Sequence, residues 1–200
     1  MEGWRASVVE YIRAEAIPVD KYGHQPRLYA LAVTVAEGLE YDDDVLFASA
    51  WMHDLGVFAG HRPHDPDELA RWDHVPYTIA RSAELLAGWG FHQEKLEAVA
   101  EVIRTHQPKD LPVTTEAVIL RDADILEQLG AVGILRAVAK IGRDSRYPTF
   151  SSVLPVLRRA AQQFPPLLRL TASRAIAASR VDIMFGVIAA IEQDGGELLF

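Results

Sequence analysis

Apolar residues recur along this 200-residue chain at the spacing of an α-helix, and the alternating pattern of a β-strand is scarce. This spacing predicts helices near residues 8–15, 28–39, 43–55, 72–87, 93–105, 115–129, 130–142 and 153–163, and a long last helix near 167–192. No internal repeat, low-complexity tract or linker divides the chain. We therefore expect a single all-α domain, a helical bundle spanning residues 1–200.

The composition excludes several function classes. Half of the residues are apolar, as in globular proteins, and the formal charge of −8 disfavours a nucleic-acid duplex or an anionic membrane as partner. The most apolar stretch, residues 181–191, is too short to span a bilayer, and the first residues lack a signal-peptide pattern. Without cysteine, any metal needs nitrogen and oxygen ligands, and we expect a cytoplasmic protein.

Three histidines are predicted to face the core of the bundle. His24, His53 and His106 each lie three or four residues from apolar positions of a predicted helix. One such histidine is typical of a core residue bonded to a backbone carbonyl, but three of them, with Asp54 beside His53, favour a metal site. Neutral imidazole and carboxylate are the usual ligands of zinc, iron and manganese when cysteine is absent.

The predicted helix near 115–129 adds two carboxylates in the sequence RDADILEQLG. Asp122 falls among apolar positions, whereas Asp124 lies on the more polar side of the same helix. Because a metal site is itself polar, a position on the polar side of the helix does not exclude Asp124 as a ligand. The spacing therefore does not decide between Asp122 and Asp124.

These motifs together resemble the HD-domain superfamily of metal-dependent phosphohydrolases. GHQPRLYALA is similar to the opening helix of that family, WMHDLGVF to its His–Asp turn, and IRTHQP to a later histidine motif of its two-metal members. LRDADILEQLGAVGILR and LTASRAIAASRVDIM resemble the closing motif and tail helix of one bacterial subgroup. The resemblance covers about residues 20–190, with a metal-site core over about 20–145 and C-terminal helices over about 150–195 packing on it.

The resemblance implies that one or two divalent ions bind, and each ion is Mn, Fe, Zn, Ni or Mg. It makes Asp124 the last ligand of a first ion that His24, His53 and Asp54 also bind. It places a second ion at His106 and a further histidine. That histidine is His74, or His61 as the alternative. His64 and His92 are expected at the surface.

The implied activity is hydrolysis of a small phosphate ester, with nucleotides among the candidate substrates, by a water that the metal activates. Arg27 is the first candidate for phosphate contact, followed by Arg62, Arg136, Arg143 and Arg146. Glu127 or Asp122 would orient a ligand or move a proton. The alternatives are a hydratase or a di-iron oxygenase on the same ligands, and a regulatory metal-binding module without turnover. A homodimer is a candidate oligomeric state. Residues 62–74 are expected to form either a lid or a solvated loop.

Overall fold

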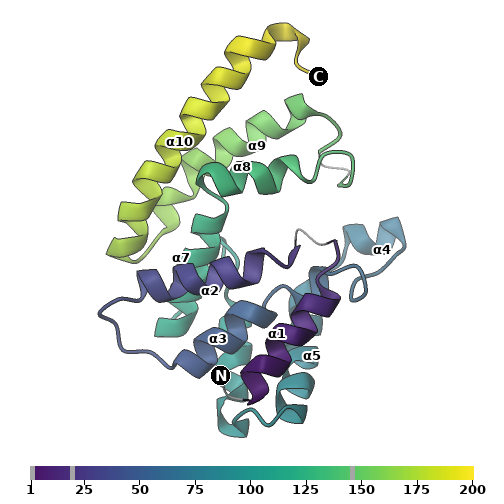
Figure 1. Ribbon diagram of the computed structural model, residues 1–200, viewed down its shortest axis with the longest axis vertical. Helices are drawn as coiled ribbons and strands as arrows, with labels where there is room; N and C mark the ends of the chain where they lie inside the picture. Colours follow the sequence, from purple (N-terminus) through teal and green to yellow (C-terminus); the bar gives the residue numbers. More distant parts are fainter. Residues whose placement is uncertain (1–2, 19–20, 145–146) are drawn as a thin grey trace. The chain divides into compact units, whose positions relative to one another are not determined.

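The computed structural model describes residues 3–18, 21–144 and 147–200, and every regular element in those ranges is a helix (Figure 1). The prediction of an all-α fold is therefore confirmed. The chain divides into two compact units, residues 1–121 and 122–200, and the boundary falls within helix α7.

The first unit is built around helix α3, whose residues from Val45 to Met52 are all buried. Helix α3 packs against α1, α2 and α6. It begins where the Asp42 carboxylate accepts the backbone N–H groups of Asp44 and Val45, which caps the first turn. The elements of this unit are α1 (Gly3–Glu15), α2 (His24–Val35), α3 (Asp43–Met52), η2 (Leu55–Val57), α4 (Pro66–Ala70), α5 (His74–Gly88), η3 (Gln93–Lys95), α6 (Leu96–Arg104) and the first residues of α7 (Thr115–Glu127).

The second unit packs the long helix α10 (Thr171–Gly195) against α8 (Gly130–Val138) and α9 (Phe150–Gln163). Two short 3₁₀ helices complete it, η4 (Pro165–Leu167) and η5 (Gly196–Leu198). The Asp122 carboxylate accepts the backbone N–H groups of Arg169 and Leu170, which ties α7 to the start of α10. Among the described helices, none has the length and apolar character that crossing a membrane requires.

Two helix boundaries differ from the sequence prediction in ways that matter for the site. The helix predicted to end near Leu55 ends at Met52, so His53 and Asp54 lie at its end and not within it. Residues 66–70, predicted as loop, form the short helix α4, because Asp65 caps its N–H groups and Pro66 suits the first helical position.

Candidate metal centre

The His53–Asp54 pair lies where the chain leaves helix α3. His53 keeps a helical backbone conformation, whereas Asp54, with φ −103° and ψ 13°, does not. The two side chains consequently approach each other, and 3.7 Å separates His53 Nε2 from Asp54 Oδ1. The end of a buried helix therefore presents an imidazole and a carboxylate toward one point.

The hydrogen bonds of two histidines determine which ring nitrogen carries the proton. His53 Nδ1 lies 3.0 Å from the carbonyl oxygen of Ala50, and His106 Nδ1 lies 2.6 Å from that of Ile103. A carbonyl oxygen only accepts, so each Nδ1 donates, and in the neutral ring each Nε2 then keeps a lone pair. This is the arrangement that metal-binding histidines use, with one nitrogen held by the protein and the other free for the ion.

The free nitrogens converge inside the first unit. Ligand atoms of His53, Asp54 and His106 all lie within 4.8 Å of one another, and 3.3 Å separates His24 Nε2 from His53 Nε2. Because His53 Nε2 is an acceptor, a proton or a cation must lie between those two rings. All three histidines are buried.

His74 completes this cluster from the first residue of α5. Its Nε2 lies 3.7 Å from Asp54 Oδ1, and its ring centroid lies 5.6 Å from that of His106. This Nε2 is buried and has no hydrogen-bond partner among the residues that the structure describes. Burial lowers the pKa of His74 although Asp54 opposes the shift, so the ring is neutral near pH 7. A buried, neutral and unpartnered imidazole nitrogen fits a metal ligand.

Asp54 is ionised at this position. Burial alone would raise the pKa of Asp54, but the positive potential of His53, His24 and Lys21 outweighs it and lowers this pKa well below the ordinary range. Lys21 was not among the residues that the sequence pattern singled out. Its only signal was its place three residues before His24, in a segment without helical spacing.

The structure separates His74 from the alternative, His61. His61 Nδ1 lies 2.7 Å from the Tyr77 hydroxyl and its Nε2 lies 3.1 Å from Glu15 Oε2, so both ring nitrogens are engaged. This geometry supports His74 as the further histidine. His64 and His92 are exposed, as expected.

Three carboxylates of α7 belong to the second unit and are buried, namely Asp122, Asp124 and Glu127. Asp122 accepts backbone N–H groups, and Glu127 lies 3.6 Å from the Arg136 guanidinium. Asp124 accepts from the Gln128 side-chain amide through its backbone oxygen, at 3.3 Å. Its assignment as the last ligand stays a prediction.

The arginines proposed for phosphate contact lie in different settings. Arg27 is exposed on α2, one turn after His24, and Arg62 is half-buried. Arg136 pairs with Glu127, and Arg143 donates to the carbonyl oxygen of Ala139. Arg146 lies outside the described residues.

Comparison with known proteins places this geometry in a family context. A family model for the HD domain matches residues 22–129, more than half of the chain. The search of curated proteins found no match to this chain. The fold is similar to YpgQ of Bacillus subtilis in complex with ADP, at 22% identity and a TM-score of 0.74, covering 98% of this chain and 96% of that one.

Two further solved structures have the same fold. A predicted HD-superfamily hydrolase from an uncultured Thermotogales bacterium is 20% identical with a TM-score of 0.64, covering 96% of this chain and 92% of that one. An HD-superfamily hydrolase from Bacillus thuringiensis is 16% identical with a TM-score of 0.68, covering 96% and 97%. At these identities the likeness concerns the fold.

Proposed function

Because the chain belongs to the HD-domain superfamily of metal-dependent phosphohydrolases, we propose that it hydrolyses a small phosphate ester, with nucleotides as the first class to test. The observation that carries the proposal is the convergence of His53, Asp54 and His106 with a lone pair on each free imidazole nitrogen. The complex of the similar YpgQ with ADP supports nucleotides as the first class.

We assign His24, His53, Asp54 and, by the resemblance, Asp124 to a first divalent ion. His74 and His106 would hold a second, with Asp54 shared between the two. The equal distances of 3.7 Å from Asp54 Oδ1 to His53 Nε2 and to His74 Nε2 support a shared role for this carboxylate. The ligand set would suit several divalent ions, because imidazole and carboxylate bind Mn, Fe, Zn and Ni alike.

A bound divalent ion would supply Lewis acidity and lower the pKa of a water molecule toward neutrality. Residues of this chain would balance the charge at the site, contact the phosphate and orient a ligand or move a proton. Asp54, held as a carboxylate, balances positive charge at the site. Arg27, exposed on the helix that carries His24, would contact the phosphate of the substrate. Of the two carboxylates proposed to orient a ligand or move a proton, Asp122 already accepts backbone N–H groups, which favours Glu127.

The test combines metal content with phosphate release. We would measure bound metal by elemental analysis on protein purified without a histidine tag, then screen phosphate release from nucleotides and sugar phosphates. His53→Ala and Asp54→Ala should lose the metal and the activity but keep their helical content. The exposed His64→Ala is the matched control and should keep both.

Each outcome separates the candidate functions. One or two equivalents of metal with phosphate release would support the hydrolase. Stoichiometric iron without phosphate release would favour the oxygenase, and metal without turnover on any substrate would favour a hydratase or a regulatory module. Absence of metal, even after reconstitution with manganese, zinc or iron, would show that these histidines do not form the site.

A further inference from the structure

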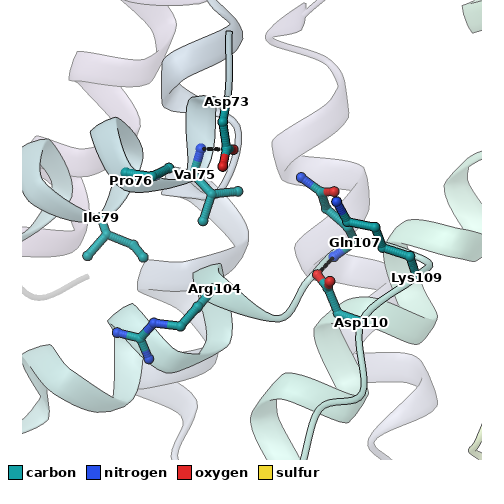
Figure 2. A pocket seen from close by; sticks show the side chains of 8 residues that line it. All are labelled: Asp73, Val75, Pro76, Ile79, Arg104, Gln107, Lys109 and Asp110. Carbon is teal, nitrogen blue, oxygen red and sulfur yellow. Dashed lines mark hydrogen bonds between the residues drawn. The ribbon is translucent and has the colours of Figure 1, made fainter. Parts of the chain in front are cut away.

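A pocket of about 390 Å³ opens between the start of α5 and the loop that follows α6 (Figure 2). Its volume lies at the lower end of the range for small-ligand sites, about 300–1,000 Å³. Figure 2 shows the apolar side chains together on one side of the gap, with Asp73 above and Arg104 below them, and three polar side chains on the other side. The two sides are formed by Val75, Pro76 and Ile79 of α5 and by Gln107, Lys109 and Asp110 of the loop.

The polar side is a rigid turn. Gln107 N–H donates to Asp110 Oδ2 at 2.9 Å, and Asp110 N–H donates back to the Gln107 carbonyl oxygen at 2.9 Å. The buried Arg121 donates to the carbonyl oxygens of Gln107, at 3.3 Å, and of Pro108, at 2.6 Å. The Gln107 side-chain amide and the Lys109 ammonium, by contrast, have no hydrogen-bond partner among the described residues. The turn therefore presents two unengaged polar groups at the pocket from a backbone that hydrogen bonds hold in place.

Hydrogen bonds also hold the apolar side of the pocket in place. Val75 and Ile79 are four residues apart on α5, so their side chains lie on one face of the helix. Asp73 caps this helix by accepting Val75 N–H at 3.1 Å, and Thr78 Oγ1 accepts Gly56 N–H at 3.0 Å. The aliphatic surface is thus fixed relative to the chain turn that follows Asp54.

The charges that line the pocket balance, because two carboxylates (Asp73 and Asp110) stand against two cations (Arg104 and Lys109). The Arg104 guanidinium is paired with Glu101 and, at 3.4 Å, with Glu97. The Asp110 carboxylate is engaged with a backbone N–H, which leaves Lys109 as the cation without a partner among the described residues that line the pocket. Such a pocket suits an uncharged ring better than a second phosphate group. A flat heterocycle has an apolar face and a polar edge, which matches one aliphatic side and one amide side.

Residues that line the pocket are sequence neighbours of two candidate metal ligands. Its two sides begin directly beside His74 and His106, since Val75 follows His74 and Gln107 follows His106. Both sides of the pocket are thus formed by residues that directly follow a candidate metal ligand in the chain.

We propose that this pocket binds the heterocyclic base of a nucleotide substrate, with Val75 and Ile79 against the face of the ring and Gln107 hydrogen-bonded to its edge. The proposal rests on the proposed function. It identifies Gln107 and Ile79 as specificity-determining residues of the same reaction, outside the predicted metal ligands.

The test compares a ligand that has a base with one that has none. In the metal-loaded enzyme, Gln107→Leu removes the amide at similar volume, and Ile79→Trp fills the pocket. We would measure KM for the nucleoside phosphates that the wild type hydrolyses, following the dephosphorylated product by chromatography. The inhibition constant of inorganic phosphate, which lacks a base, and the bound metal are measured on the same samples. Gln93→Leu, an exposed glutamine of η3, is the matched control.

We expect KM to rise about 2–12-fold in Gln107→Leu, the range for loss of one hydrogen bond. In Ile79→Trp it should rise at least about tenfold, since burial of the ring face is lost. The inhibition constant of phosphate and the metal content should stay unchanged in both. Unchanged KM values, or KM and the phosphate constant rising together, would overturn the pocket assignment while leaving the hydrolase intact. If the wild type releases no phosphate from any nucleotide, the nucleotide proposal fails and the pocket proposal fails with it.

Discussion

A methyl group added at Gly56 would meet three atoms of helix α5 at 2.9 Å each: His74 Cβ, the His74 carbonyl oxygen and Thr78 Oγ1. Ordinary contact begins at 3.4 Å, so the start of α5 would have to move by about 0.5 Å, the difference between 3.4 and 2.9. Gly56 itself has little freedom to move away. Its N–H donates to Thr78 Oγ1 at 3.0 Å, and its carbonyl oxygen accepts the Trp72 indole N–H at 2.8 Å.

We therefore expect Gly56→Ala to displace His74 relative to Asp54. Overpacking of this kind costs about 1–3 kcal/mol of unfolding free energy. For a chain of this length each kcal/mol lowers Tm by about 2–4 °C. Metal–ligand distances hold within about 0.2 Å, so a shift of about 0.5 Å should weaken the ion proposed at His74 and His106 far more than the fold.

The assay is manganese stoichiometry after equilibrium dialysis, with calorimetric unfolding of the metal-free protein. Gly60→Ala is the control, because a methyl group there would have its nearest neighbour, Glu15 Oε2, at 3.6 Å. Gly56→Ala should bind one equivalent less than wild type and unfold at a lower temperature, and Gly60→Ala should match wild type. Wild-type stoichiometry, affinity and Tm in Gly56→Ala would refute the reasoning.

Five other substitutions, in three comparisons, test particular contacts. Asp124→Asn should lose metal, whereas Asp122→Asn should keep it but lose about 1–3 kcal/mol of stability because two backbone N–H groups lose a charged acceptor; greater metal loss in the Asp122 variant, by elemental analysis, would reverse the assignment. His74→Ala should lose one equivalent of metal and His61→Ala none; equal losses would contradict the choice between them. Burial, helped by a hydrogen bond to a carboxylate, raises the pKa of Tyr29 to about 12. Its stabilising contribution is therefore complete below about pH 10 and is lost as pH rises toward 12; urea unfolding across this range should show a steeper decline in wild type than in Tyr29→Phe.

Much of the fold followed from the spacing of apolar residues, because a helix that buries one face repeats its pattern every three to four residues. Helix ends were less predictable. The apolar run around α3 continues through Leu55, but the helix stops at Met52, and the turn at Asp54 depends on what packs there. The short helix α4 buries no side chain, so it left no apolar pattern to read.

The sequence by itself determined the helical class and the residue types of the candidate site, since inward-facing positions can be read from periodicity along one helix. Only the tertiary structure decided how each polar group is used. His61 and His74 are alike in the sequence, yet His61 is bound at both nitrogens, by Tyr77 and by Glu15, while His74 Nε2 is left without a partner. Asp122 likewise finds its donors at Arg169 and Leu170, far along the chain. A periodic pattern shows which face of a helix a residue occupies, but its hydrogen-bond partners come from distant segments that only folding brings together.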